Sequence, residues 1–160
     1  LTGHLVFSTL HTNSAVGGFA RLVDLGGEPQ MIGSAFNMIL GQRLVRKLCE
    51  QCKKERNTTA DEQKLISRIM EQPVAIDTIF EAPGCDACSF TGFRGRIGVM
   101  EGIRVDDAVE KALLEDPRES NILAIAKSQG IPTMQQDGVM KVLAGITSLD
   151  ELSRVLDLHA

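Results

Sequence analysis

Tryptophan and tyrosine are absent from this chain, and its 160 residues include only six phenylalanines. Proteins that read single-stranded nucleic acids usually stack the bases on exposed aromatic rings, so this composition argues against a base-stacking surface. The net charge of −4 points the same way, because general nucleic-acid binders carry a basic surface. We therefore expect no nucleic-acid partner.

Long apolar runs are also absent. No stretch reaches the roughly 20 apolar residues that a transmembrane helix needs, so the sequence predicts no transmembrane segment. The start of the chain, Leu1-Thr2-Gly3-His4, has neither the positive charge nor the apolar core of a secretory signal. With 43% apolar and 24% charged residues, the composition is that of a globular protein with a real core.

Cysteine is scarce but strictly organised. The four cysteines form two pairs of one spacing, Cys49-Glu50-Gln51-Cys52 and Cys85-Asp86-Ala87-Cys88. A tetrahedral zinc ion takes four thiolates, and two C-x-x-C turns supply them. The sequence therefore predicts one structural zinc site whose ligands are Cys49, Cys52, Cys85 and Cys88.

Other interpretations of the cysteines are weaker. Two disulfides require an oxidising compartment, and the chain start carries no secretory signal. A thioredoxin-type redox pair explains one C-x-x-C but not two. A catalytic zinc keeps an open coordination position, whereas four thiolates close the site.

The whole sequence divides into three expected parts. The sequence of residues 1–48 predicts a piece of α/β structure. Residues 4–12 are expected to form a buried strand of a parallel sheet, and Asn13 is expected to cap the helix that follows. A second helix is expected to carry an apolar stripe that reaches Leu40, and residues 42–48 are expected to form a short strand. Residues 49–96 form the tetracysteine subdomain, with a helix near 61–71. Residues 97–160 comprise a strand over 97–103 and a C-terminal helical bundle.

The α/β part is incomplete by itself. One buried strand and two helices do not cover both faces of a parallel sheet. We therefore expect the chain to be the C-terminal part of a longer protein.

Six segments of the sequence carry a family resemblance, namely Thr2–Asn13, Arg21–Gly26, Gln42–Cys49, Gly84–Cys88, Thr91–Gly98 and Asp137–Thr147. Together they resemble the family of type II secretion and type IV pilus assembly ATPases, almost from end to end of the chain. Thr2–Asn13 resembles the segment called the histidine box in that family, and a histidine box joined to a tetracysteine site is a specific combination.

The resemblance implies a RecA-like P-loop ATPase domain that works as a homo-hexamer. Such an ATPase uses ATP and Mg²⁺ to drive assembly of a pseudopilus or a pilus. It is cytoplasmic, lies at the inner membrane, and engages a platform protein there. The sequence does not separate secretion from pilus extension.

The phosphate-binding motif G-x-x-x-x-G-K-[ST] occurs nowhere in this sequence. In the family it precedes the histidine box, as does the Walker B carboxylate. Without these groups nothing cradles the β- and γ-phosphates or completes the Mg²⁺ site. We therefore assign no catalytic residue to this chain and expect the chain alone to hydrolyse no ATP.

Three residues of the histidine box are candidate nucleotide contacts. His11 matches the family histidine that approaches the γ-phosphate, and an imidazole can hydrogen-bond that oxygen. Thr9 is a possible donor beside it, but threonine is equally a common strand residue. His4 lies seven residues earlier, on the opposite face of the expected strand, where an architectural or interface role is as reasonable.

Three cations are candidate interface residues. Arg21 lies on the first expected helix, where it either reaches a neighbouring subunit or is simply solvated. Arg46 and Lys47 belong to a basic cluster near the first cysteine pair. That cluster either docks the platform protein, an acidic subunit or anionic lipid, or offsets the net −2 charge of a zinc tetrathiolate.

The rival function is a zinc-knuckle adaptor that docks protein or nucleic-acid partners. An adaptor has no need for the segment Thr9-Leu10-His11-Thr12, so the histidine box favours the ATPase family. A zinc enzyme is disfavoured by four thiolate ligands.

Overall fold

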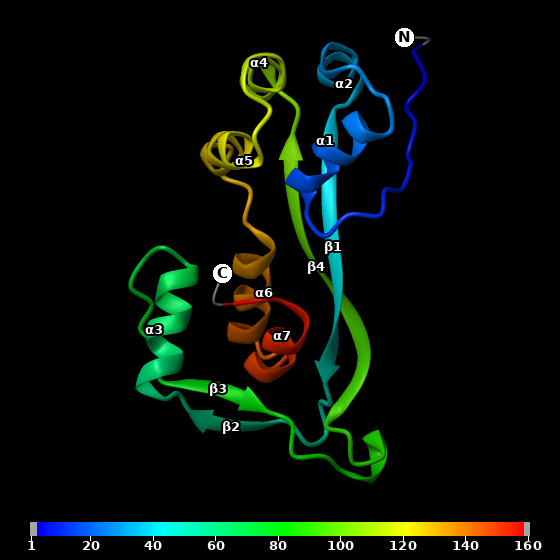
Figure 1. Ribbon diagram of the computed structural model, residues 1–160. Helices are drawn as coiled ribbons and strands as arrows, with labels where there is room; N and C mark the ends of the chain where they lie inside the picture. The colour runs from blue at the N-terminus through cyan, green and yellow to red at the C-terminus, as the bar shows by residue number, and fades with distance from the viewer. Residues whose placement is uncertain (1–2, 159–160) are drawn as a thin grey trace. The chain divides into compact units, whose positions relative to one another are not determined.

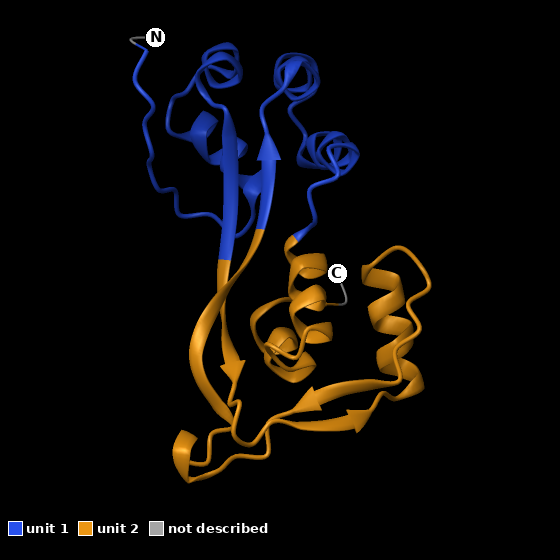
Figure 2. Ribbon diagram, turned by 180° about the vertical axis from the view of Figure 1, so that it is seen from behind, with its two compact units in different colours: residues 1–42, 101–133 blue, residues 43–100, 134–160 orange. Residues whose placement is uncertain are grey.

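The computed structural model describes residues 3–158. They fold into two compact units, each assembled from two separate stretches of chain (Figure 2). Unit 1 comprises residues 1–42 and 101–133, and unit 2 comprises residues 43–100 and 134–160. Two long strands, β1 (Met38–Leu48) and β4 (Phe93–Arg104), contribute residues to both units. They form a two-stranded antiparallel sheet (Figure 1).

Unit 1 adds helices to the ends of these strands, namely α1 (Ala15–Asp24), α2 (Pro29–Ala35), α4 (Asp107–Glu115) and α5 (Glu119–Ser128). Helix α2 packs against α4, and α5 packs against both α1 and α4. Their apolar faces meet the inward-facing residues of β1 and β4. The resulting core consists of Ala15, Val16, Phe19, Ile32, Ile39, Ile103, Val109, Ala112, Leu113, Ile122 and Ala126.

The segment before α1 differs from the sequence-based expectation. Residues 4–12 form no strand, and Leu5, Val6 and Phe7 are 71%, 76% and 89% exposed. A strand needs a neighbouring strand to pair its backbone groups, and the described residues supply none for this segment. The helix cap is also Ser14 rather than Asn13, because the Ser14 hydroxyl accepts a hydrogen bond from the Gly17 amide at 3.2 Å.

The second helix is shorter than its apolar stripe suggested. Helix α2 ends at Ala35, and Met38 already begins β1. Ile39 is 8% exposed whereas Leu40 is 65% exposed, which is the in-and-out alternation of a strand. The expected strand at 42–48 is therefore the second half of a longer one.

Unit 2 contains a second two-stranded antiparallel sheet, formed by β2 (Lys54–Asn57) and β3 (Thr78–Glu81). Helix α3 (Ala60–Ile69) confirms the helix expected near 61–71 and begins with a capping box between Thr59 and Glu62. Helices α6 (Met134–Leu143) and α7 (Leu149–Val155) complete the unit. Its core is mostly aliphatic and comprises Val45, Ile66, Ile69, Ile76, Ile79, Val99, Met134, Val139, Val142, Leu149, Leu152 and Leu158.

Candidate metal centre

The first cysteine pair lies in a tight turn directly after β1. The amides of Cys52 and Lys53 both donate to the carbonyl of Cys49, at 3.2 and 2.8 Å. This turn brings the Cys52 side chain back toward Cys49, which is buried. The C-x-x-C spacing thus folds locally into the knuckle expected from the sequence.

The second pair forms a similar turn around a short 3₁₀ helix, η1 (Asp86–Cys88). The amides of Cys85 and Gly92 each donate to Cys88 Sγ at 3.2 Å. Gly92 has φ +75°, and a Cβ there would lie 2.6 Å from the Ala82 Cβ and carbonyl oxygen. Only glycine fits this close turn, so Gly92 is part of the construction of the knuckle.

The four sulfur atoms gather in one cluster, all within 4.8 Å of one another. Measured Sγ–Sγ separations are 4.0 Å for Cys49–Cys85, 3.9 Å for Cys52–Cys88 and 3.8 Å for Cys85–Cys88. Tetrahedral zinc with Zn–S bonds of about 2.3 Å requires sulfurs about 3.8 Å apart. All four are free thiols, so the donor set and its spacing fit zinc and not two disulfides.

The thiols differ in acidity. Burial opposes ionisation of Cys88, but the hydrogen bonds from Cys85 and Gly92 outweigh it and lower the pKa of Cys88 to about 6. Burial, together with hydrogen bonds to the other cysteines, raises the pKa of Cys52 to about 12. Because a metal binds thiolates, loading such a cluster displaces protons.

A loop from the C-terminal part of the chain holds the first knuckle in place. The Leu48 amide donates to the Ile146 carbonyl at 2.8 Å, and the Thr147 hydroxyl donates to the Arg46 carbonyl at 2.8 Å. The Lys53 ammonium donates to the Gly145 carbonyl at 3.3 Å. Hydrogen bonds to backbone carbonyls therefore anchor the knuckle on both sides of Cys49.

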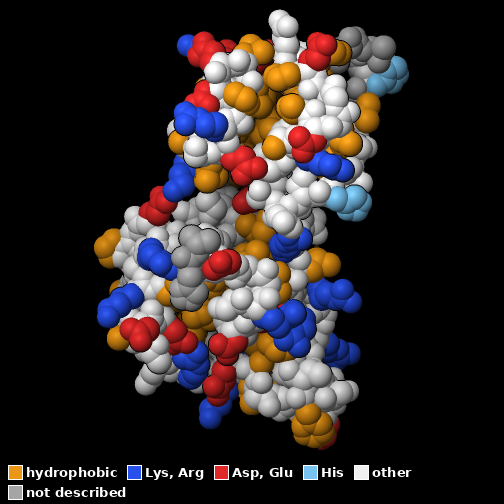
Figure 3. Space-filling view, viewed as in Figure 1, with side chains coloured by type: hydrophobic (Ala, Val, Ile, Leu, Met, Phe, Trp, Pro, Cys, Tyr) orange, Lys and Arg blue, Asp and Glu red, His pale blue; other side chains and the backbone are white. Residues whose placement is uncertain are grey.

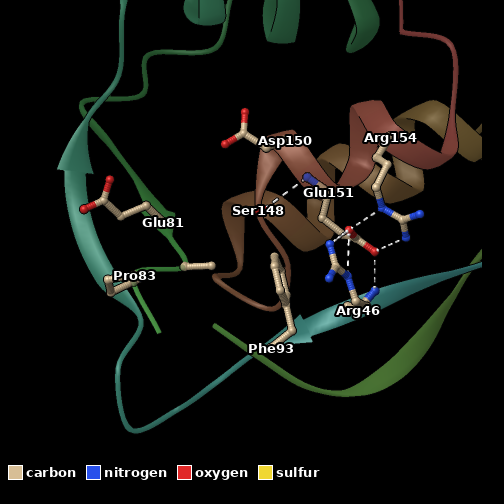
Figure 4. Close-up of a pocket in the computed structure, with 9 residues that line it drawn as sticks. Arg46, Glu81, Pro83, Phe93, Ser148, Asp150, Glu151 and Arg154 are labelled. Atoms are coloured by element: carbon tan, nitrogen blue, oxygen red, sulfur yellow. Dashed lines mark hydrogen bonds and ion pairs between the residues drawn. The ribbon is translucent and has the colours of Figure 1, made fainter. Parts of the chain in front are cut away.

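A buried carboxylate completes this anchor (Figure 4). Glu151 Oε1 accepts from the Arg46 amide at 3.0 Å, and the Glu151 carboxylate pairs with the guanidinium groups of Arg46 and Arg154. Burial raises the pKa of Glu151, but these hydrogen bonds outweigh it and lower the pKa to about 2. The Arg46 guanidinium also lies 4.1 Å from the centre of the Phe93 ring. These residues line a cleft of about 450 Å³.

The candidate interface cations are placed differently from one another. Arg46 is engaged with Glu151, although 42% of its side chain stays exposed. Lys47 is exposed, as is Arg21 in the last turn of α1. Neither Lys47 nor Arg21 forms an ion pair within the described residues. Lys47 and Arg21 are thus the two of these three cations that a partner would meet unpaired.

The candidate nucleotide residues lie in unit 1, in the exposed segment before α1. His4, Thr9 and His11 are all exposed, and Figure 3 shows histidine side chains at the surface of unit 1. Thr12 is held, because its hydroxyl donates to the Ser14 carbonyl at 3.0 Å. The part of unit 1 described here does not by itself gather His4, Thr9 and His11 into a pocket.

A family pattern described as type II/IV secretion system protein matches residues 1–154. The chain belongs to this family. The match begins before the histidine box and continues through both cysteine pairs, so the resemblance inferred from the motifs is confirmed.

Curated relatives agree with this assignment. The type II secretion system ATPase E of Vibrio cholerae is 41% identical over 155 residues, which are 97% of this chain and 30% of that protein. The type II secretion system protein E of Aeromonas hydrophila is 42% identical over 156 residues, with the same coverage of 97% and 30%. The type IV pilus assembly ATPase PilB of Thermus thermophilus is 37% identical over 158 residues, covering 98% of this chain and 18% of that protein.

The chain thus spans less than a third of each of these relatives. Among the described residues, no helix combines the length and apolarity needed to cross a membrane.

Two carboxylates with long-range hydrogen bonds, Glu101 and Glu151, were not singled out from the sequence. Glu151 was visible there only as the fourth position of an S-x-x-E capping box.

Proposed function

We propose that this chain is the C-terminal part of a hexameric ATPase that couples ATP hydrolysis to assembly of a type II secretion pseudopilus or a type IV pilus. The observation that carries the proposal is the family match over residues 1–154, which joins the histidine box to the tetracysteine cluster. An adaptor built around a zinc knuckle gives no reason for that junction.

The four cysteines hold a structural zinc ion in this proposal. Their spacing suits four thiolate ligands, which leaves no open position for substrate. Bound zinc supplies a cross-link between the turn after β1 and the turn before β4. The role of the cysteines is therefore to fix the shape of unit 2.

His11 and Thr9 contribute to the nucleotide site. In the complete ATPase, strands from the preceding residues pair with the histidine box, which accounts for the exposure of Leu5, Val6 and Phe7 here. Paired in this way, His11 hydrogen-bonds the γ-phosphate and responds to its loss. His4, on the other face, contacts the sheet or a neighbouring subunit.

The remaining chemistry lies outside this chain. The P-loop, the Walker B carboxylate and the Mg²⁺ they hold belong to the preceding part of the ATPase, so residues 1–160 alone do not hydrolyse ATP. Arg21 and Lys47 provide contacts to a neighbouring subunit and to the inner-membrane platform protein, respectively. The ATPase works at the cytoplasmic face of that membrane.

The test compares the full-length ATPase, residues 1–160 alone, and full-length His11→Ala. The full-length protein hydrolyses ATP and residues 1–160 do not. His11→Ala lowers kcat by about two to three orders of magnitude, as removal of a single positioned hydrogen-bond donor typically does. Steady-state ATPase assays measure all three, with zinc content and hexamer size as checks on folding.

Each part of the proposal is refuted by a different result. A full-length protein without ATPase activity overturns the function. Unchanged kcat in His11→Ala overturns the role of His11 while leaving the family function intact. Turnover by residues 1–160 that survives removal of contaminating ATPases overturns the assignment of the chemistry to the preceding segment.

A further inference from the structure

A carboxylate from β4 holds the first turn of α1. Glu101 Oε1 accepts a hydrogen bond from the Ala15 amide at 2.7 Å, across 86 residues of sequence. Ala15 is the first residue of α1, and the first amides of a helix have no partner within the helix. A carboxylate is the favoured acceptor there, because the amides at a helix start carry a partial positive charge.

The opposite strand is shaped to admit this carboxylate. Gly41 of β1 lies directly beside it: a Cβ at position 41 would be 2.9 Å from Glu101 Cγ and Oε1, and 3.1 Å from the Ala15 amide nitrogen. Any side chain at position 41 would push the Glu101 carboxylate away from Ala15. Gly41, Glu101 and the Ala15 amide therefore form one fitted contact, which we name the α1 latch.

The α1 latch lies four residues after His11. Between them the chain is also tied, because the Thr12 hydroxyl donates to the Ser14 carbonyl and the Ser14 hydroxyl accepts from the Gly17 amide. Residues 12–15 thus form a short braced link, whereas His11 and the segment before it are exposed. The latch is a long-range side-chain contact at the point where the histidine box meets α1.

We infer that Glu101 is a positioning residue for His11 and sets its aim toward the γ-phosphate. This inference rests on the nucleotide role proposed above for His11. Glu101 touches neither nucleotide nor reacting atoms in this scheme and acts only through the backbone of residues 12–15. A displacement of the order of 1 Å in such a group is known to cost up to about a hundredfold in rate, so a loosened latch has a measurable effect.

The experiment is a double-mutant cycle in the full-length ATPase. Glu101→Ala lowers kcat for ATP about tenfold and leaves KM within about twofold, because the phosphate-binding residues outside this chain still hold the ground state. In the His11→Ala background Glu101→Ala has no further effect on kcat. Glu101→Gln keeps an acceptor oxygen and restores part of the lost activity.

Gly41→Ala gives an independent route to the same state, since it displaces the carboxylate without removing it. It lowers kcat in the wild-type background and has a smaller effect on kcat in the Glu101→Ala background, where only the 3.1 Å approach to the Ala15 amide remains. The matched control is Glu115→Ala, which removes an exposed carboxylate of α4 in the same unit and leaves kcat unchanged.

Three results would overturn the inference. The first is unchanged kcat in Glu101→Ala. The second is a loss that adds in full to that of His11→Ala, which marks a purely structural role. The third is an undiminished effect of Gly41→Ala when Glu101 is already absent. His11→Ala alone tests the underlying nucleotide role, so failure of that role is distinguishable from failure of the latch.

Discussion

The two units differ in how completely they cover their apolar side chains. Among residues 3–158, fourteen large hydrophobic side chains are exposed, of which ten belong to unit 1 and four to unit 2. Those of unit 1 are Leu5, Val6, Phe7, Val23, Leu25, Met31, Met38, Leu40, Leu114 and Leu123. Orange side chains are correspondingly visible on unit 1 in Figure 3.

Unit 2 buries polar groups in addition to its aliphatic core. The buried polar residues Thr147, Ser148 and Glu151 all belong to it, and so do the four clustered cysteines. Every one of these groups lies at or near the first knuckle or its anchor. The difference teaches that unit 2 adds a tetracysteine cluster and a buried ion-pair network to its aliphatic core, whereas more of the large apolar side chains of unit 1 stay exposed.

Removal of zinc is expected to have the largest effect on the difference between unit 2 and unit 1. In the purified protein, chelation should raise hydrogen exchange in residues 49–57 and 78–93 of unit 2 while leaving α1, α2 and α4 of unit 1 unchanged. A ligand held at a thousand times its Kd stabilises a fold by about 4 kcal/mol, and unit 2 should lose a contribution of this order. Mass-resolved hydrogen exchange with and without chelator measures it.

Cys88→Ser provides the control for this experiment. The variant should lack stoichiometric zinc, show the raised exchange without chelator, and not respond when chelator is added. Returning zinc should restore protection in the wild type only. Equal loss of protection in both units would show that the zinc cluster is not specific to unit 2, and an unchanged pattern would rule out a structural metal.

Glu151 offers the next largest test, because its carboxylate is buried between two arginines. Glu151→Ala leaves the Arg46 amide without its acceptor and two half-exposed arginines without their partner. An unsatisfied buried group of this kind typically costs about 1–3 kcal/mol, so unit 2 should be destabilised by about that amount. The neighbouring exposed carboxylate provides the control, since Asp150→Asn should change stability by less than about 0.5 kcal/mol. Denaturant unfolding, with probes in each unit, measures both variants.

The same carboxylate gives unit 2 an acid-sensitive term. The pKa of Glu151 is about 2 in the folded protein, below the ordinary value of 4.5, so ionised Glu151 stabilises the fold above pH 4.5. That contribution, on the order of 3 kcal/mol, should disappear as the pH falls from about 4.5 to 2. Zinc-free protein isolates the effect from thiolate protonation. A Glu151→Gln variant with the same acid dependence as the wild type would contradict this account.

The cysteine cluster could be predicted from sequence because each pair of ligands lies within four consecutive residues. A fixed C-x-x-C spacing folds into a knuckle with few other choices, and α3 likewise follows from its Thr59–Glu62 capping box. The joining of the two knuckles needed only the assumption that four thiolates share one ion. Local structure of this kind forms independently of contacts with distant parts of the chain.

The errors arose where distant partners decide the structure. Residues 4–12 have the composition of a buried strand, but no described residue pairs with them. Ile39 and Leu40 continue a helical stripe, yet pairing with β4 draws them into a strand. Glu101 and Glu151 find their backbone partners 86 and 105 residues away. Neither separation is visible in a local pattern. The division into parts 1–48, 49–96 and 97–160 follows sequence motifs and stays a prediction beside the two discontinuous units that packing defines.

Lys47 allows the most delicate test of the contrast, because it separates surface recognition from stability within unit 2. It is exposed and has no ion pair among the described residues, while the adjacent Arg46 is bound to Glu151. Lys47→Glu should therefore change the free energy of unfolding by less than about 0.5 kcal/mol and leave zinc content unchanged. If this face docks the platform protein, the same substitution should weaken binding to the cytoplasmic part of that protein, as measured by titration calorimetry.

Arg46→Glu is the informative counterpart, since it places a second carboxylate against Glu151 and should destabilise unit 2 itself. Undiminished platform binding by a folded, zinc-loaded Lys47→Glu protein would remove Lys47 from the proposed interface.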